Sequence, residues 1–474
     1  MIDVTEQKQR VAVIGGGISG LAAAFYLQQE AKEKKLPLEI VLIESSHRLG
    51  GKIQTVRKEN FIIERGPNSF IDNNNSMAKL VQDLGIEEQL IRSEAGQPYI
   101  TVNEKLYPVP AGSIFGIPTK LSSFVASDIV SWSGKVRAAC DLWFPRSRIQ
   151  EDQPLGKFLR RRFGKETVEN IIEPLLLGVS AGDIEQLSLQ ATFPELIEME
   201  KEYRSLMTGM KKALSEISHD DSKGIEDQRP FQTFINGLET LVEALEGQLT
   251  DTTILKSVKV ESIAKAAHQV ILSLNNKSSI TADAVILATP HLITQKMFAK
   301  QGLLQGLQDI PLTTVASVSM AFPIDAMNES FTGTGLTVAR NSDFSITSCS
   351  WAHRKWPSFV PEGYALLEVY VGRPGDEAIV DLSDGEIEKI VLQDLNRVIP
   401  LKGNPLFTVV SRWKEAMPQY KVGHAQRVEL AKQELNEHFP TMKLVGSSYE
   451  GTSLPNCVDQ ARSAVDELLI KLFE

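Results

Sequence analysis

The sequence has little of what disulfide frameworks, metal centres and hydrolytic sites are built from. Its 474 residues include only three cysteines, Cys140, Cys349 and Cys457, which lie far apart and form no C-x-x-C pair. Such a set indicates neither a disulfide framework nor a zinc site, and it fits a reducing compartment. The seven histidines are scattered, and H-E-x-x-H is absent. We therefore expect no metal ion and no hydrolytic nucleophile.

The chain also lacks an excess of positive charge and long apolar runs. Its net charge of −10 and its pI near 5.4 argue against nucleic acid as a partner, because phosphate binding needs clustered Lys and Arg. No uncharged apolar run reaches the roughly 18 residues that a membrane-spanning helix needs. The first ten residues, MIDVTEQKQR, resemble neither a secretory signal nor a transit peptide. We expect a soluble, cytoplasmic protein.

One segment, 106–144, departs from this polar character. Its apolar stretches are interrupted only by five charged residues, Lys120, Asp128, Lys135, Arg137 and Asp141. The segment is the one candidate for peripheral contact with a membrane surface. Because no basic face accompanies the apolar one, the sequence favours a place in the core of a helical domain.

A glycine-rich turn near the N-terminus carries the first functional signal. The apolar run Val11 to Ile14 predicts a buried strand, and Gly15, Gly17 and Gly20 follow at G-x-G-x-x-G spacing before the helical run LAAAFYL. Such a loop lets backbone approach a pyrophosphate, which then meets the free N–H groups of the helix N-terminus. The sequence therefore predicts a dinucleotide site.

The second predicted strand, residues 40–43, supports this prediction. It ends in Glu44, where an acidic residue would meet a ribose 2′-hydroxyl. A lone glycine fingerprint is weak evidence, since a glycine turn without a ligand has the same pattern. Here strand, glycines, helix, strand and acid follow in the required order.

The residues after Glu44 indicate which dinucleotide is bound. The run ESSHRLGGK, from Glu44 to Lys52, resembles the extended fingerprint of FAD-containing amine-oxidase-like flavoproteins. This resemblance implies that Arg48 and the paired glycines lie near the flavin diphosphate. Simple NAD-binding Rossmann enzymes generally lack this extension.

The order of predicted elements indicates an α/β fold. We expect a Rossmann-type FAD-binding domain assembled from discontinuous segments, with an α+β substrate domain and a mainly helical domain. The expected FAD-binding domain comprises 1–75, 230–290 and 405–474, the substrate domain 76–105 and 291–404, and the helical domain 106–229. Residues 253–259 and 270–274 are predicted to form a hairpin-like unit. Residues 384–398 and 458–472 are predicted to form helices.

The whole chain resembles the porphyrinogen oxidases of heme biosynthesis. The motifs that carry the resemblance are RLGGKIQT, ERGPNSF, EPLLLGVSAGD, TFPEL, RNSDF, RWKEAMPQY-x-x-GH and GSSYEG, in this order. The resemblance implies non-covalent FAD, molecular oxygen as electron acceptor and hydrogen peroxide as by-product. It implies oxidation of coproporphyrinogen III to coproporphyrin III.

The resemblance also implies which residues form the site. Contacts to FAD are expected from the following residues: Gly15, Gly16, Gly17, Ile18, Ser19, Gly20, Glu44, Ser45, Arg48, Gly51, Lys52, Gly66, Pro67, Asn68, Ser69, Val260, Trp413, Thr452, Ser453 and Leu454. Asn68 is expected to face flavin and substrate, and it could equally be a turn residue that bonds its own backbone. Gly178 is expected to line the substrate cavity.

Two departures from the family pattern leave alternatives open. Residues 72–75 read DNNN where relatives carry basic residues, and 451–457 read GTSLPNC where a loop like GVGIPDC is usual. The alternatives are a protoporphyrinogen IX oxidase, another flavin oxidase acting on an amine or a polyene, and an inactive porphyrin-binding relative. Transient contact with a ferrochelatase is a further hypothesis, because the product must reach a metal-inserting enzyme.

Overall fold

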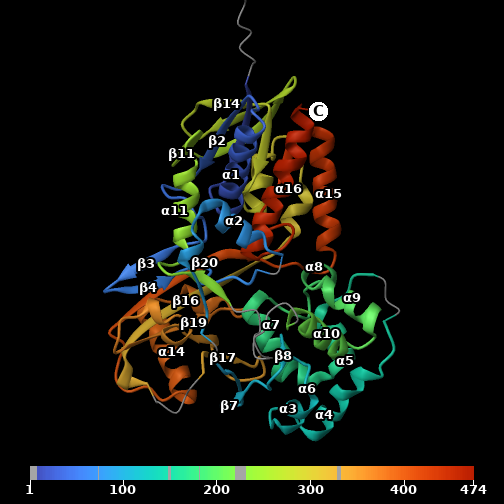
Figure 1. Ribbon diagram of the computed structural model, residues 1–474, viewed down its shortest axis with the longest axis vertical. Helices are drawn as coiled ribbons and strands as arrows, with labels where there is room; N and C mark the ends of the chain where they lie inside the picture. Colours follow the sequence, from blue (N-terminus) through green and yellow to red (C-terminus); the bar gives the residue numbers. More distant parts are fainter. Residues whose placement is uncertain are drawn as a thin grey trace, which may run out of the picture.

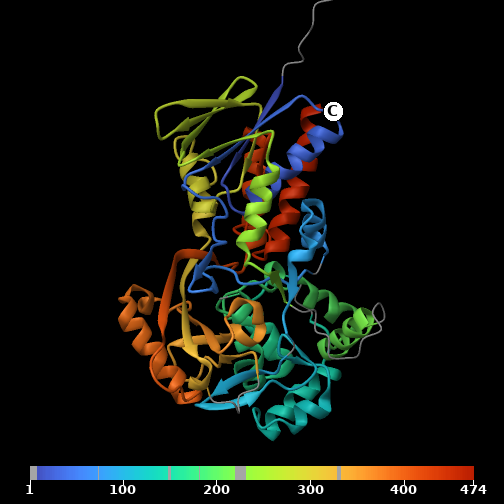
Figure 2. The same ribbon diagram turned by 60° about the vertical axis from the view of Figure 1, so that its left-hand side comes forward.

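The structure is a computed structural model that describes residues 8–72, 74–94, 96–147, 151–180, 182–218, 231–327 and 333–473. Figures 1 and 2 show a parallel sheet with its helices at one end of the molecule. A second, larger sheet and a group of helices lie beside each other at the opposite end. Within these residues, no helix combines the length and apolarity needed to cross a membrane.

The parallel sheet contains five strands in the order β11-β2-β1-β15-β21. Their bounds are β1 Gln9–Ile14, β2 Leu38–Glu44, β11 Thr252–Lys256, β15 Ala284–Leu287 and β21 Met442–Leu444. The central strands are apolar on both faces because helices cover one face and a small sheet covers the other. A sheet built from such distant segments confirms the predicted fold class.

Two layers pack on this parallel sheet. One face carries α1 Ile18–Glu33, α2 Ser76–Leu84, α11 Glu239–Gln248 and α16 Leu454–Phe473. The other face carries the antiparallel strands β12 Val260–Ala266, β13 Gln269–Leu274 and β14 Ser279–Ala282, with α12 His291–Met297 and α15 His424–His438. Smaller strands complete this half of the molecule: β3 Thr55–Lys58, β4 Phe61–Glu64, β5 Leu90–Arg92 and β10 Gln232–Phe234.

The predicted hairpin of residues 253–259 and 270–274 is wrong in its pairing. β11 lies parallel to β2, with Lys256 opposite Glu44, and β12 pairs with β13 instead. The run 252–256 completes the edge of the parallel sheet, where it reaches long-range partners that a local pattern does not reveal.

The larger sheet has seven strands in the order β20-β16-β19-β18-β17-β6-β7. Their bounds are β6 Pro98–Val102, β7 Lys105–Pro108, β16 Leu312–Pro323, β17 Gly335–Val338, β18 Ile346–Trp351, β19 Tyr364–Val371 and β20 Phe407–Pro418. Helix α14, Asp384–Val398, packs on one face, and the short helix α13, Ala352–Lys355, follows β18. The expected FAD-binding segment 405–474 included β20, but β20 pairs with β16.

The remaining helices form one group with its own apolar core. They are α3 Leu121–Ala126, α4 Trp132–Ala139, α5 Leu155–Phe163, α6 Lys165–Thr167, α7 Glu173–Ser180, α8 Leu189–Thr192, α9 Pro194–Tyr203 and α10 Leu206–Ser218, with the short strands β8 Ser113–Ile114 and β9 Ile117–Pro118. Part of segment 106–144 contributes to this core, through Ile117, Phe124 and Ala138. Trp132 and Trp143 are exposed, so the segment is not wholly internal.

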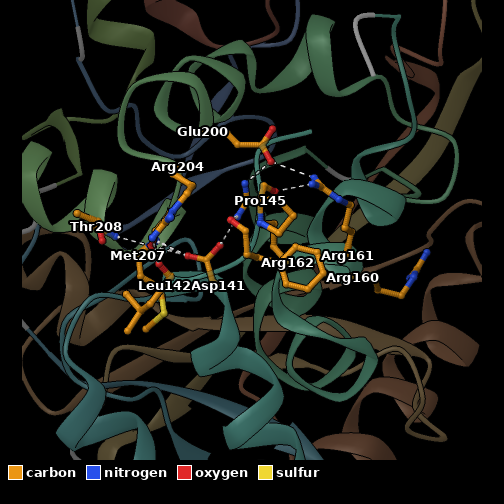
Figure 3. A network of polar contacts seen from close by, with 12 residues as sticks. Asp141, Leu142, Pro145, Arg160, Arg161, Arg162, Glu200, Arg204, Met207 and Thr208 are labelled. Carbon is orange, nitrogen blue, oxygen red and sulfur yellow. Dashed lines mark hydrogen bonds and ion pairs between the residues drawn. The ribbon is translucent and has the colours of Figure 1, made fainter. Parts of the chain in front are cut away.

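A buried ion network holds this helical group together (Figure 3). The Arg162 guanidinium is fully buried and pairs with Asp141, 3.2 Å away, and with Glu200. Asp141 also accepts hydrogen bonds from the Ser205 hydroxyl and the Met207 N–H, at 2.7 and 3.0 Å. The network therefore ties α5 to α9, to α10 and to the turn that contains Asp141.

We expect Arg162→Met to lower the free energy of unfolding by about 3–5 kcal/mol, because the change leaves buried carboxylates without their cation. Arg161→Met is the matched control: Arg161 pairs with the same Glu200 but is 28% exposed, so a loss of at most about 1 kcal/mol is expected. Urea unfolding of both variants measures the difference. Equal unfolding midpoints for the two variants would contradict the larger contribution to stability that we expect from Arg162.

Candidate functional site

The glycine loop lies at the carboxyl end of β1. Gly15 has a φ of +107°, and an added Cβ on Gly20 would stand 1.8 Å from the Gly15 carbonyl oxygen, so this turn requires glycine. Gly17 is the N-cap of α1 and supplies no side-chain cap, and the first turn of α1 contains no acidic residue. The N–H groups of that turn are therefore available to an external anion.

The space in front of Gly17 fits such a ligand. An added Cβ on Gly17 would meet nothing within 4 Å, in contrast to those on Gly15, Gly16 and Gly20. A backbone that faces open space at a helix N-terminus can accept a phosphate group at close range. The residues present thus fit the diphosphate of a dinucleotide.

Glu44 braces the loop from the end of β2. One carboxylate oxygen accepts a 2.6 Å hydrogen bond from the Gly16 N–H, and the other accepts a 2.7 Å bond from the Ser46 N–H and a 3.2 Å bond from the Ser45 hydroxyl. The predicted contact of Glu44 with a ribose stays a prediction. Its position beside the glycine loop is the one that this contact requires.

The second glycine segment lies directly across the first. The Gly50 N–H donates to the Gly16 carbonyl at 2.8 Å, and an added Cβ on Gly51 would stand 3.1 Å from the Cα of Gly17. Arg48 holds this segment, since its guanidinium donates to the Gly51 carbonyl at 3.0 Å and pairs with Glu239 at 3.3 Å. The guanidinium is thus engaged by protein groups, and its contact with a diphosphate stays a prediction.

Lys52 connects the cofactor loop to the loop that begins at Gly66. An added Cβ on Gly66 would stand 1.9 Å from the Lys52 carbonyl oxygen, so the two backbones touch. Burial lowers the pKa of the Lys52 amine, and among the described residues only the Cys457 thiol offsets this effect. An ammonium group without a carboxylate partner is suited to an anionic or electron-rich ligand.

The C-terminal glycine loop reaches the same region. Ser19, in the first turn of α1, lies 3.7 Å from an added Cβ on Gly446 and bonds the Cys457 thiol. Gly451 has a φ of +99°, and its N–H donates to the Tyr420 hydroxyl at 2.9 Å. Thr452 and Ser453 are exposed, and Leu454 begins α16.

The loop 65–69 crosses the inner face of the seven-stranded sheet. The Arg65 carbonyl accepts hydrogen bonds from the Trp413 indole at 2.6 Å and from the Ser317 hydroxyl at 3.2 Å. The Arg65 guanidinium donates to the Ser411 hydroxyl at 2.9 Å. Trp413 is therefore positioned by this loop.

Asn68 is anchored to the sheet by its side chain. Its amide nitrogen donates to a Glu368 carboxylate oxygen at 3.0 Å and to the Tyr370 hydroxyl at 3.2 Å, and its amide oxygen accepts from the Ser69 hydroxyl at 2.7 Å. Both N–H donors of the amide are used by the protein. This geometry fixes the orientation of Asn68 and differs from a turn residue that bonds only its own backbone.

Glu368 and Tyr370 were missed as site residues from the sequence. The strand ALLEVYVG carries one charge among apolar residues, and the period-2 alternation places Glu368 and Tyr370 on the same face. A charge inside an apolar strand was the available signal. The partner of that charge, Asn68, is 300 residues away and could not be inferred locally.

The remaining predicted residues lie as follows. Val260 is buried at the start of β12, and the neighbouring Val258 N–H donates to the Glu44 carbonyl at 3.0 Å. Gly178 belongs to α7, but its surroundings lie outside the described residues. In the unusual segment 72–75, the Asp72 carboxylate accepts a 2.7 Å bond from the Ala78 N–H, so it serves the first turn of α2.

Comparison with known proteins identifies the family. Residues 18–469 match the model of the flavin containing amine oxidoreductases. The chain is 46% identical to a Bacillus subtilis protein named coproporphyrinogen III oxidase, covering 99% of this chain and 100% of that protein. It is 36% identical to a protein of the same name from Staphylococcus aureus, covering 98% and 99% of the two chains.

A solved structure agrees with this assignment. It is described as a candidate protoporphyrinogen oxidase from Exiguobacterium sp. 255-15, and it superposes with a TM-score of 0.87 at 32% identity, covering 98% of this chain and 99% of that one. The resemblance seen in the sequence is therefore confirmed, as are the predicted flavin cofactor and the oxidoreductase class. The chain belongs to the flavin-containing amine oxidoreductase family.

Proposed function

We propose that the chain is an FAD-dependent oxidase that converts coproporphyrinogen III to coproporphyrin III in heme biosynthesis, with O2 as acceptor and H2O2 as by-product. The observation that carries this proposal is the 46% identity, over essentially the whole of both chains, to a relative that bears this activity in its name. A protoporphyrinogen IX oxidase is the second candidate, favoured by the name given to the similar solved structure.

The residues that would hold FAD surround the glycine loop. The N–H groups at the start of α1 and the open space at Gly17 support binding of the diphosphate, and Glu44 supports binding of the ribose. Lys52, the 66–69 loop, Trp413 and the 452–454 loop support the ring end of the site. When bound, FAD supplies a hydride acceptor, which is the chemistry that no side chain of this protein can provide.

The substrate requires two kinds of bond to break. In each of three two-electron oxidations, one saturated bridge between pyrroles loses a C–H hydrogen with its electron pair, and a pyrrole loses its N–H proton to neutralise the resulting cation. The fourth bridge loses a C–H proton in a tautomerisation that returns a proton to a nitrogen, so that six electrons are removed in all. The protein must hold a large ring against the cofactor and provide a destination for the proton. Asn68 and Trp413 lie on the loop and sheet face where we place the ring.

Three further assignments belong to this proposal. The chain divides into a cofactor, a substrate and a helical domain, with β20 assigned to the substrate domain. Its product passes to a metal-inserting enzyme through transient contact with a ferrochelatase. The protein works in the cytoplasm, with peripheral contact to membranes through segment 106–144, where Trp132 and Trp143 are 69% and 71% exposed.

Gly17→Ala tests the cofactor site. Gly17 has a φ of −74°, which alanine adopts without strain, and the added methyl group would point into the space assigned to the diphosphate. We expect unchanged stability without FAD and at least about a tenfold loss of FAD affinity, or 1.4 kcal/mol. Titration of the flavin-free protein with FAD, monitored by flavin fluorescence, measures the affinity.

Gly247→Ala is the matched control, because an added Cβ there also meets nothing within 4 Å but the residue lies in α11. Its FAD affinity should equal that of the wild type. If Gly17→Ala also binds FAD with wild-type affinity, the diphosphate does not bind at this loop.

The reaction itself is tested by mixing the FAD-loaded protein with coproporphyrinogen III or protoporphyrinogen IX without oxygen. We expect coproporphyrinogen III to bleach the flavin band, and porphyrin fluorescence to rise above the no-enzyme control when oxygen is admitted. Faster bleaching by protoporphyrinogen IX would select the second candidate. Failure of both substrates would overturn the porphyrinogen assignment and leave an amine or polyene substrate, or an inactive porphyrin-binding protein.

A further inference from the structure

Glu368 is a buried carboxyl group in which only one of the two oxygens accepts a hydrogen bond. It lies on β19, is 1% exposed, and faces the 65–69 loop, where one of its oxygens accepts the hydrogen bond from Asn68. Its other oxygen, Oε1, is buried and has no hydrogen-bond partner within the described part of the chain. Burying a carboxylate oxygen without a partner costs free energy that neighbouring contacts do not return.

Anchoring Asn68 does not explain this cost. A glutamine at position 368 would present an amide oxygen to the same Asn68 N–H and would not bury an ionisable group. Buried carboxyls with perturbed pKa values next to a cofactor loop are candidates for proton transfer. An unpartnered acceptor at this place therefore calls for a donor that arrives with the substrate.

We infer that Glu368 is the proton acceptor for the pyrrole N–H groups of the porphyrinogen, with Oε1 as the receiving atom. This inference rests on the proposed function. Each of three oxidations would break one bridge C–H bond, whose hydrogen would leave with its electron pair to bound FAD, and one pyrrole N–H bond, whose proton would form an O–H bond at Glu368. The fourth bridge would lose a C–H proton by tautomerisation onto a nitrogen. The nitrogen keeps the N–H electron pair, which closes the C=N bond of the product.

The titratable groups near Glu368 come from four elements. Burial raises the pKa of the Glu368 carboxyl, whereas Asn68 and the Lys355 ammonium on α13 act to lower it. Burial also raises the pKa of Glu64 on β4 to about 8, and it raises those of the Cys349 thiol on β18 and the Tyr370 phenol on β19. Lys355 is thus the one nearby cation among these groups that favours the ionised, basic form of Glu368.

Glu368→Gln is the decisive variant, since it keeps the volume and an acceptor for Asn68 but removes the base. We expect at least about a 100-fold fall in kcat, a KM within about threefold and an unchanged FAD content. The wild-type rate should fall as the pH drops through the pKa of Glu368, and this acidic limb should disappear in the variant. If Glu368→Gln keeps the wild-type kcat and the acidic limb of the pH–rate profile, the inference is overturned and Glu368 is a positioning residue.

Asp394→Asn is the matched control. Asp394 is another buried carboxyl beside the same sheet, and it accepts hydrogen bonds from the Ser345 and Ile346 N–H groups on the side away from the 65–69 loop. The kcat and the pH–rate profile of Asp394→Asn should match those of the wild type. If the wild type itself oxidises no porphyrinogen, the proposed function fails and this inference fails with it, which is distinct from loss of kcat in the variant alone.

Thermal unfolding gives a readout that does not depend on turnover. Because burial raises the pKa of Glu368 in the folded protein, its ionised form weakens the fold above the unfolded pKa. Glu368→Gln should therefore melt at the same or a higher temperature than the wild type at pH 8, with the difference shrinking as the pH falls. A lower melting temperature or a lower FAD content in the variant would show a structural role and overturn the inference.

Discussion

The close contact between Gly66 and the Lys52 carbonyl oxygen is the constraint on which the site depends. At this point the backbone of the cofactor fingerprint touches the backbone of the loop that crosses the larger sheet, and no side chain fits between them. On one side, Gly50 and Gly51 lie across the glycine loop of β1 and α1. On the other side, the loop continues through Arg65 to Trp413 and through Asn68 to Glu368. A displacement at this contact would separate the residues that we assign to the cofactor from the sheet face that we assign to the substrate.

Local sequence patterns predicted the elements that bury one regularly spaced apolar face. The helices at 384–398 and 458–472 were expected from apolar spacing, and they are found as α14 and as most of α16. The pairing of 252–256 could not be predicted, because a short apolar run fits a hairpin as well as the edge of a parallel sheet. The strand 407–418 lay within the segment 405–474 that we expected to bind FAD, and its pairing with β16 could not be predicted for the same reason. Pairing is decided by partners hundreds of residues away, such as β16 for β20.

In the candidate site, too, contiguous motifs could be predicted and contacts between distant segments could not. The glycine loop, Glu44 and the RLGGK run are contiguous motifs whose backbone geometry follows from their own residues, so the sequence placed them correctly beside one another. Asn68 was expected in the site as well, but its orientation depends on Glu368 and Tyr370, which come from a different strand. A motif supplies the residues that we expect near the cofactor, while the tertiary fold decides which of their atoms remain free. For Asn68 the fold uses both N–H donors.

Two buried carboxyls near this site show how satisfied and unsatisfied groups differ. Glu64 accepts the Thr55 hydroxyl at 3.0 Å and the Leu238 N–H at 2.6 Å, so its desolvation is offset by donors that fold with it. Glu368 has one donor on one oxygen and none on the other within the described residues. Both groups have raised pKa values caused by burial, so a shifted pKa alone does not separate structure from function. Glu368 differs from Glu64 in its unfilled hydrogen-bonding capacity beside the 65–69 loop, and it is this capacity, together with that position, on which we base its role.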